Sequence, residues 1–456
     1  MHRRTFLRQM VSTTAMFLTG ASFASGLSKA NRPNIILIMA DDIAYDNNFG
    51  AYASNDSWTP QLDKMASEGV KFGHCYSTPK CTPSRVKIMT GRSGVRNYIR
   101  FGALDRNETT FATMLRNAGY KTFVAGKWQL DGPGGTETKE SGFDSWLLWN
   151  TKIAGGNRYW EPKLERDGRL LKVDKDAYGP DVCVDAIATF MKNNKERPFF
   201  VYYPMLLVHS PFLPTPDSKD RNEKDKQKNF KDMVKYMDKC VGRILDCLKV
   251  NGLDRNTVVM FTTDNGTHRN IRYQSRGKDV FGKKGIPHDR GTHAPLVIRH
   301  PASIRPGSVC DDIVDFSDFV PTLAEIAGAK LTDEEIDGKS FWPQCQGKKG
   351  NPRRWIYQYY WPKSYSWIPS ELGTAELIWA QNKRYKLYGN GLFYDIMKDR
   401  EEEHPIHSEK RNAEEKSAAN SLRAAIASMP ATNKAYDGKP AKSGRYNRNL
   451  SQNGSS

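Results

Sequence analysis

The sequence predicts an α/β fold, in which helices flank a large mixed, mostly parallel sheet and a smaller C-terminal α+β domain carries an antiparallel sheet. Three continuous apolar runs, at 35–40, 198–204 and 257–262, are typical of strands that are buried on both faces. After about Trp342 the pattern changes to alternating aromatic and polar residues, which indicates antiparallel strands. A helix expected at 413–428 closes this smaller domain.

The helices expected between the buried strands have recognisable sequence signals. The pair Thr59-Pro60 predicts a helix start, because threonine caps helices and proline is tolerated at the first helical position. Apolar spacing predicts further helices at 109–118, 181–194 and 230–250. Alternation of strands and helices along the chain is typical of a parallel sheet covered on both faces.

Between the second and third of these helices the pattern weakens. A short strand is expected at 121–125. The segment 131–166 is rich in Gly, Lys, Trp and Asn and has no clear period. We expect a long loop there, which either contacts a substrate or forms plain surface.

The N-terminus predicts export from a bacterial cell. Arg3-Arg4 begins a twin-arginine pattern, and the weakly apolar run 10–23 contains no acidic residue. Small residues then offer cleavage sites, so residues 1–30 are expected to be a twin-arginine-type signal peptide. The run is too short and too polar to span a bilayer, and we expect no stable membrane insertion. The mature protein is expected in the periplasm or outside the cell.

Charge points to a polyanionic partner. The chain of 456 residues has a net charge of +18. The signal peptide carries four of these charges and the polar tail 431–456, which we expect to be disordered, carries a net four more, so about +10 remains. An exported protein meets acidic polysaccharide rather than nucleic acid, and no nucleic-acid-binding module is recognisable. The remaining chain is divided into a catalytic domain at 31–342 and a C-terminal subdomain at 343–430.

Oxygen donors follow two of the predicted strands. Asp41 and Asp42 end the first buried run, and Asp264-Asn265 follow the run at 257–262. Carboxyl ends of parallel strands meet at one edge of a sheet, where α/β proteins place their sites. Adjacent carboxylates repel unless a cation lies between them, so these residues predict a hard-cation site. The alternative is a solvated strand end followed by a simple turn.

A second candidate centre is Cys81-Thr82-Pro83-Ser84-Arg85. Pro83 is suited to the first turn of a helix, which would place Cys81 at the helix N-terminus, where backbone N–H groups favour anions. Arg85, one turn later, would face the same way. The pattern therefore predicts a cysteine-derived group beside an anion site. The alternative is a buried cysteine at a loop–helix junction. The other six cysteines are too few for a disulfide scaffold, and their spacing does not determine their pairing.

These motifs together resemble those of the type I sulfatases. The element C-x-P-x-R at 81–85 is followed by T-G-R, and the segment 119–130 reads G-Y-K-T-F-V-A-G-K-W-Q-L, similar to the family's second signature. An H-x-P element begins at His209, a D-N-G element at Asp264 and a K-G element at Lys284. The resemblance covers about residues 33–400 and keeps the family's order.

The resemblance implies an alkaline-phosphatase-like fold and a sulfuric ester hydrolase. It implies that a formylglycine-generating maturation enzyme converts Cys81 to formylglycine, the nucleophile. As a hydrated aldehyde, this group offers one hydroxyl to attack sulfur and a second to expel sulfate. A dication, calcium first and magnesium second, would have only oxygen ligands. The implied ligands are Asp41, Asp42, residue 81, Asp264 and Asn265.

The resemblance also assigns roles to the basic residues. Arg85, Lys127 and Lys284 would neutralise charge on the sulfate oxygens. His209 would protonate the leaving oxygen of a sulfated polysaccharide or oligosaccharide. Lys127, His209 and Lys284 would thus contact the substrate as well as catalyse.

One position departs from the family in a way that affects the chemistry. Gln129 stands where the family has a histidine that handles the proton of the diol, and glutamine cannot act as a base. His293, His268 or a ligand aspartate would have to take this role, unless turnover is slow, and we prefer His293. The alternative is that both histidines are structural. Asp289, Arg290 and His293 also depart from the residues that the family has after its K-G element.

Two rival functions are compatible with the sequence. The first is a phosphate or phosphonate ester hydrolase on the same fold, which could share the metal and lysine chemistry. The second is a non-catalytic binder of sulfated glycans, for which Gln129 would mark lost activity. Against a binder stands the intact motif at 81–85. The sequence does not indicate which sugar or ring position is used, whether chain ends are attacked, or the oligomeric state.

Overall fold

The computed structural model describes residues 32–52, 56–131, 137–150, 157–331, 335–361, 368, 370–372 and 376–433. The expected signal peptide and nearly all of the basic tail lie outside these residues. Within the described part of the chain, no helix has both the length and the apolar character needed to cross a membrane.

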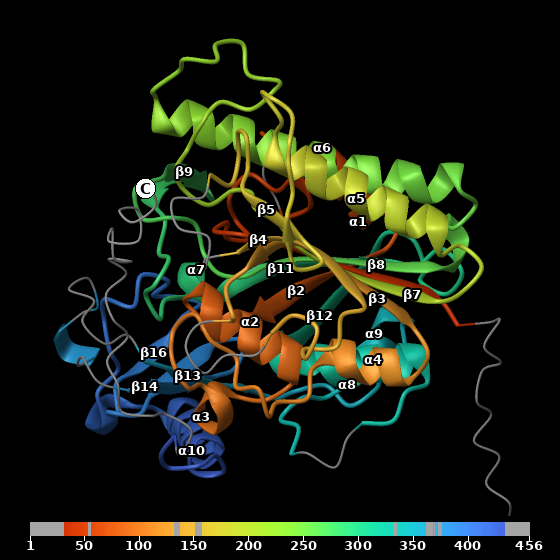
Figure 1. The fold of residues 1–456 in the computed structure, drawn as a ribbon. Coiled ribbons are helices and arrows are strands. Elements are labelled where there is room, and N and C mark those ends of the chain that lie inside the picture. The colour runs from red at the N-terminus through yellow and green to blue at the C-terminus, as the bar shows by residue number, and fades with distance from the viewer. Residues whose placement is uncertain are drawn as a thin grey trace, which may run out of the picture.

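A ten-stranded mixed sheet forms the centre of the molecule (Figure 1). Its strand order is β12-β2-β11-β8-β1-β7-β3-β4-β5-β6. β1 is parallel to both of its neighbours, whereas β11 is antiparallel to both of its own. The predicted α/β class is confirmed. The strands are β1 Asn34–Ala40, β2 Val70–Tyr76, β3 Lys121–Trp128, β4 Ser145–Asn150, β5 Leu164–Arg166, β6 Arg169–Leu170, β7 Phe199–Pro204, β8 Thr257–Thr263, β11 His293–Arg299 and β12 Ser308–Asp315.

Helices cover both faces of this sheet, and each face has its own apolar core (Figure 1). α1 (Pro60–Ser67), α5 (Gly179–Asn193) and α6 (Lys226–Val250) lie on one face. The opposite face carries four helices. These are α2 Cys81–Thr90, α4 Phe111–Asn117, α8 Phe319–Ala327 and α9 Trp342–Cys345. Burial on both sides explains why the central strands read as continuous apolar runs.

Shorter elements complete the large domain and the C-terminal part of the chain. A hairpin of β9 (Arg272–Ser275) and β10 (Lys278–Phe281) follows β8. The short helices are α3 Gly94–Asn97, α7 Asp289–Thr292, and the 3-10 turns Gly50–Tyr52, Asp254–Asn256, Phe316–Asp318, Ser370–Leu372 and Ser408–Lys410.

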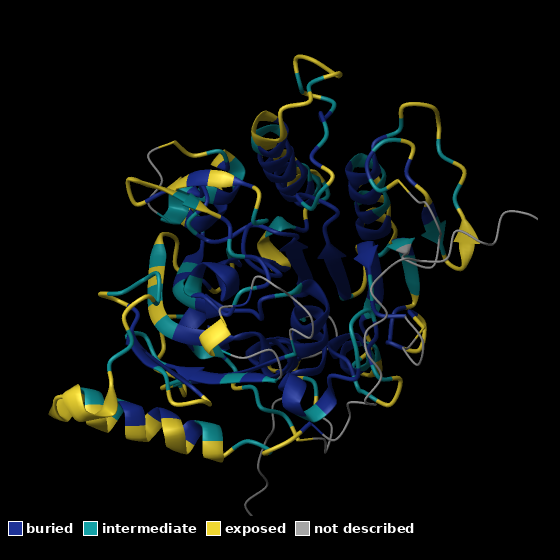
Figure 2. Ribbon diagram, turned by 90° about the vertical axis from the view of Figure 1, so that its left-hand side faces the viewer, coloured by how far each residue is buried: buried dark blue, intermediate teal, exposed yellow. Residues whose placement is uncertain are grey.

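The C-terminal part forms a four-stranded antiparallel sheet with one helix packed on it. Asn412 begins α10 (Ala413–Ala427) with a capping box that involves Glu415. α10 buries Ala419, Leu422 and Ala425 and exposes most of its other residues, and Figure 2 shows that many further exposed residues lie on loops. The strands are β13 Ile356–Tyr360, β14 Leu377–Gln381, β15 Tyr385–Tyr388 and β16 Phe393–Asp395. The domain boundary between 342 and 343 stays a prediction.

The expectation of one long loop over 131–166 is wrong. β4 runs parallel to β3, with Phe123 opposite Ser145, and β5 pairs antiparallel with β4. The strand signal of Trp146-Leu147-Leu148 is short and is surrounded by residues typical of loops. Pairing with β3 decides its conformation, and that pairing is not a local property of the sequence.

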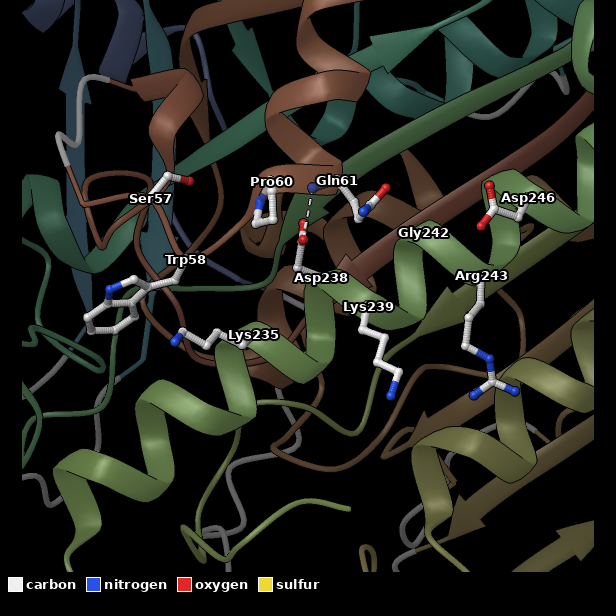
Figure 3. A pocket seen from close by; sticks show the side chains of 10 residues that line it. All are labelled: Ser57, Trp58, Pro60, Gln61, Lys235, Asp238, Lys239, Gly242, Arg243 and Asp246. Atoms are coloured by element: carbon white, nitrogen blue, oxygen red, sulfur yellow. Dashed lines mark hydrogen bonds between the residues drawn. The ribbon is translucent and has the colours of Figure 1, made fainter. Parts of the chain in front are cut away.

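A surface hollow of about 420 Å³ is lined by the start of α1 and by α6, beside the point where the two helices meet (Figure 3). Asp238, on α6, accepts hydrogen bonds from the backbone amides of Gln61 and Leu62, both at 2.9 Å. These first-turn amides have no partner inside their own helix, so Asp238 satisfies them from the neighbouring one. The contact joins two helices of the same layer.

Candidate active site

Four oxygen-bearing residues meet where β1 and β8 end. The two strands are parallel with Ala40 opposite Thr263, so the residues that follow them must be neighbours. The backbone amide of Asp42 donates to Asp264 Oδ1 at 3.2 Å, and Asn265 Nδ2 donates to Asp42 Oδ1 at 2.9 Å. Asp41 is completely buried beside them. The structure thus brings together the donors that the sequence placed at two strand ends.

Cys81 lies buried at the N-terminus of α2, directly after the connection from β2. Ser84 fixes this connection, because its hydroxyl lies 2.8 Å from that of Thr78 and accepts the Thr78 amide at 3.0 Å. The amide of Gly285 donates to Pro79 O at 2.8 Å. The loop that carries Lys284 is therefore attached to the segment that carries Cys81.

Each of the three carboxylates has one buried cationic partner. These pairs span 86 to 242 residues of sequence and converge on one point. Arg85 and Lys284 are also near Cys81, whose side chain is one of the charges acting on the pKa of each. The pairs are Lys127 Nζ to Asp41 Oδ2 at 2.7 Å, Arg85 Nη2 to Asp264 Oδ2 at 2.8 Å, and Lys284 Nζ to Asp42 Oδ2 at 2.6 Å.

The carboxylates nevertheless differ in their protonation. Burial alone would raise the pKa of Asp41, but Lys127 and His209 hold that pKa well below its usual value. Burial, and then the charge of Asp41, raises the pKa of Asp264 to about 7. Such a split is expected when carboxylates share one buried site. The three carboxylates are matched in number by Lys127, Lys284 and Arg85.

His209 completes the cluster on one side. Its Nδ1–H donates to the Ser210 carbonyl at 2.7 Å, which leaves Nε2 facing Asp42 Oδ2 at 3.8 Å. Burial, followed by the charge of Lys284, lowers the pKa of His209 to about 3. Ligand atoms of Asp41, Asp42 and His209 lie within 4.8 Å of one another.

Two oxygen atoms in the cluster have no hydrogen-bond partner among the described residues. They are Asp41 Oδ1 and Asn265 Oδ1, and both are buried. Buried polar atoms are rarely left without a partner. A hard dication that takes carboxylate and amide oxygens would satisfy both atoms, so the residues present fit such an ion.

Arg158 is a fourth cation at the site, and the sequence analysis missed it. Its side chain is 10% exposed, and its Nη1 lies 3.8 Å from Asp41 Oδ2 without a hydrogen bond to any described residue. The guanidinium lies 4.0 Å above the ring of Trp149, in β4. No spacing pattern in the sequence marks this arginine, which lies within the segment 131–166, where the sequence has no clear period.

A family model described as Sulfatase matches residues 33–329, well over half of the chain. The chain belongs to the sulfatase family of sulfuric ester hydrolases. This family is part of the alkaline-phosphatase superfamily. A second model, N-sulphoglucosamine sulphohydrolase, C-terminal, matches residues 278–429. The enzyme is also 30% identical to arylsulfatase A of Homo sapiens over 386 residues, which cover 74% of this chain and 72% of that protein.

Two solved structures show the same fold as this sulfatase. Ps i-CgsB superposes with a TM-score of 0.71 at 24% identity, over 87% of this chain and 93% of that one, and has also been solved in complex with k-i-k-neocarrahexaose. BT4656, in complex with its substrate D-glucosamine-2-N,6-O-disulfate, has a TM-score of 0.71 at 22% identity, over 86% and 97% of the two chains.

The three residues considered for proton handling in this sulfatase differ in their surroundings. His293 Nε2 lies 2.9 Å from Gly73 O, and its Nδ1 lies 3.4 Å from Asp289, so both ring nitrogens face away from the carboxylate cluster. His268 is partly buried, and Asp42 and Lys284 both act on its pKa, which burial lowers. Gln129 keeps a buried Oε1 without a partner among the described residues.

The C-terminal sheet supports the loop of Lys284 in the sulfatase. Tyr360, in β13, donates its hydroxyl to Gly285 O at 3.1 Å, and Tyr388, in β15, donates to Pro287 O at 2.9 Å. Arg290 makes a bidentate ion pair with Glu401 at 2.7 and 2.8 Å. Arg290, one departure from the family pattern, is therefore engaged with the C-terminal part of the chain.

Proposed function

We propose that this sulfatase cleaves sulfate esters of a sulfated polysaccharide or oligosaccharide with a formylglycine made from Cys81 and a bound calcium ion. The observation that carries the proposal is the position of Cys81. It stands buried at the start of α2, one turn before Arg85, and the loop that carries Lys284 is hydrogen-bonded to the segment that leads into it. A structural cysteine has no need of these charged neighbours.

Asp41, Asp42, Asp264, Asn265 and an oxygen of modified residue 81 would hold the ion. The two orphaned oxygen atoms, Asp41 Oδ1 and Asn265 Oδ1, support this assignment. All donors are oxygens, which favours calcium, with magnesium second. The ion would supply positive charge that lowers the pKa of a bound hydroxyl and attracts the sulfate.

Formylglycine, once hydrated, supplies a nucleophilic hydroxyl and a second hydroxyl that allows sulfate to leave. Residues of the chain then bind and orient the ester. Lys127 and Lys284 would neutralise the sulfate oxygens, and Arg85 would hold the nucleophile beside Asp264. His209 Nε2 would donate a proton to the leaving oxygen once the bound anion has raised its pKa.

Proton removal from the nucleophile must differ from the family pattern, because Gln129 cannot accept a proton near neutral pH. The contacts of His293 with Gly73 and Asp289 argue against the role we first preferred for it. His268, or one of the ligand aspartates, is therefore the better candidate.

Charge and structural neighbours support a glycan substrate. About +10 of net charge remains on 31–430, and the two neighbouring structures were solved with a neocarrahexaose and a disulfated glucosamine. The signal at 1–30 supports export by the twin-arginine route, which carries folded proteins, so that Cys81 could be modified before export.

The deciding experiment is the mass of the peptide that carries Cys81, from protein made in its own host or together with a formylglycine-generating enzyme. A mass that corresponds to the aldehyde or its hydrate is expected. An unmodified thiol under these conditions would rule out the formylglycine mechanism. Rates on matched sulfate and phosphate esters should then favour sulfate, and the reverse order would indicate a phosphate or phosphonate ester hydrolase.

A further inference from the structure

A cavity of about 650 Å³ opens beside His209 and belongs to none of the groups described so far. Its wall begins with Ser210 and continues through Phe212, the segment that directly follows His209. His268 lines it from the other side and stacks edge-on against Phe212, with ring centres 5.5 Å apart. Ser210 directly follows His209, whose Nε2 lies 3.8 Å from Asp42 Oδ2, so the cavity lies next to the carboxylate cluster.

The position of the cavity indicates which part of a substrate reaches it. His209 is the residue that would protonate the leaving oxygen, so the sugar that loses sulfate must lie against His209. The segment 210–214 extends from that point into the wall of the cavity. A chain that continues from the leaving sugar would therefore enter this space.

The chemistry of the wall suits a charged sugar. Trp160 Nε1 donates to Pro214 O at 2.9 Å, which fixes the indole ring. The guanidinium of Arg221 lies 3.6 Å above this ring, and among the described residues it forms no ion pair with a carboxylate. The indole thus orients the guanidinium by a cation–π contact, and a guanidinium binds sulfate or carboxylate in a bidentate way.

The charge balance of the wall is positive. Lys224 and Lys226 line the cavity together with Arg221. Glu223 is the acidic side chain among the described residues of the wall. Its carboxylate accepts hydrogen bonds from the backbone amides of Lys224 at 2.9 Å and Asp225 at 2.8 Å, and it forms an ion pair with Lys228. The negative charge of Glu223 is thus already compensated, and an anionic ligand would meet unopposed cations.

We propose that this cavity binds the sugar residue next to the one that loses sulfate, with a sulfate or carboxylate of that residue on Arg221, which Trp160 holds in place. The volume lies within the range of small-molecule sites and exceeds what a single sulfate group needs. This inference rests on the proposed function and adds to it: the preferred substrate is an oligosaccharide with a second anionic residue.

The test compares Arg221→Gln with Arg255→Gln. Both arginines are exposed. Arg221 precedes α6 and Arg255 follows it, and because the 25 residues of this helix span about 37 Å, Arg255 lies at the far end of the helix from the cavity. Two kinds of substrate are used for the wild type and each variant: 4-methylumbelliferyl sulfate, which carries no second sugar residue, and tetrasaccharides. The tetrasaccharides are κ- and ι-carrageenan, which differ in sulfation, and chondroitin sulfate with intact or reduced carboxyl groups.

For Arg221→Gln, the kcat/KM on the best tetrasaccharide relative to that on the aryl sulfate should fall at least tenfold, mainly through KM. Arg255→Gln should leave this ratio unchanged. A loss confined to the more sulfated carrageenan would identify sulfate as the anion on Arg221, and a loss confined to unreduced chondroitin sulfate would identify carboxylate. An unchanged ratio for Arg221→Gln would overturn the proposal.

Binding measurements distinguish a failure of this inference from a failure of the proposed function. Calorimetric titration of the same tetrasaccharides into a Cys81→Ala variant needs no turnover. If the wild type cleaves no sulfate ester but the tetrasaccharides bind and Arg221→Gln weakens them tenfold, the cavity proposal stands and the mechanism fails. If aryl sulfate is cleaved but no tetrasaccharide binds, the cavity proposal fails alone.

Discussion

Arg158 Nη1 lies 3.8 Å from Asp41 Oδ2, although Lys127 already neutralises that carboxylate at 2.7 Å. With three carboxylates each paired to one cation, Arg158 is additional positive charge at the centre. It is also pre-oriented, because its guanidinium is stacked on Trp149.

This relationship predicts that Arg158 contributes to turnover of the sulfate ester. Arg158→Gln removes the charge but keeps a polar side chain, and we expect kcat/KM to fall roughly 10- to 100-fold, equivalent to about 1.4–2.8 kcal/mol. Steady-state kinetics on an aryl sulfate would measure this. Arg169→Gln, at an exposed arginine of β6, serves as the matched control and should retain full activity. Equal activity of both variants would contradict the role.

The contribution of His209 to kcat is predicted to increase with the basicity of the leaving group. His209→Gln should reduce kcat by about 10²- to 10⁴-fold on a sugar sulfate, the usual contribution of a general acid. The loss should be much smaller on 4-nitrophenyl sulfate, because that phenolate leaves without being protonated. Rates across a series of aryl sulfates would show a steeper dependence on leaving-group pKa for the variant. An identical dependence in both proteins would exclude His209 as the acid.

Removal of the dication is predicted to destabilise the enzyme as well as inactivate it. Calcium at 100 times its dissociation constant would add about 2.7 kcal/mol to the free energy of unfolding. Thermal unfolding in EDTA and after calcium is restored would show the difference. In Asp264→Asn the added calcium should raise the unfolding temperature much less, because one ligand charge is lost. An equal calcium effect in the variant would remove Asp264 from the ligand set.

Asp238 gives a prediction about stability that is independent of catalysis. Asp238→Ala leaves the amides of Gln61 and Leu62 without their partner and should cost about 1–2 kcal/mol. Burial raises the pKa of Asp238 to about 7, above the unfolded value of about 3.9. A raised pKa means that the contribution is complete below the unfolded value and is lost as pH rises through 7.

The difference in unfolding free energy between wild type and Asp238→Ala should therefore shrink between pH 4 and pH 8. Chemical unfolding at several pH values would measure it. Asp246→Ala is the control, because this exposed residue lines the same hollow. If the difference in unfolding free energy instead grows with pH, the two amide hydrogen bonds stabilise the charged carboxylate of Asp238 by more than burial destabilises it.

The sequence by itself determined the central strands of the large sheet and the donors at its edge. Runs of apolar residues are a local signal, and parallel strands must end at one edge, so Asp41 and Asp264 could be placed together without coordinates. The position of Cys81 at a helix start followed from Pro83, whose ring restricts the backbone locally.

Only the tertiary structure decided which charges meet and which histidines face the site. Lys127 joins Asp41 across 86 residues, and Arg158 reaches the same carboxylate from a segment with no pattern of its own. His293 looked like a replacement for the family histidine, yet the pairing of β11 with β2 turns it toward Gly73. Such contacts depend on strand register and loop packing over long sequence separations, which no local spacing encodes.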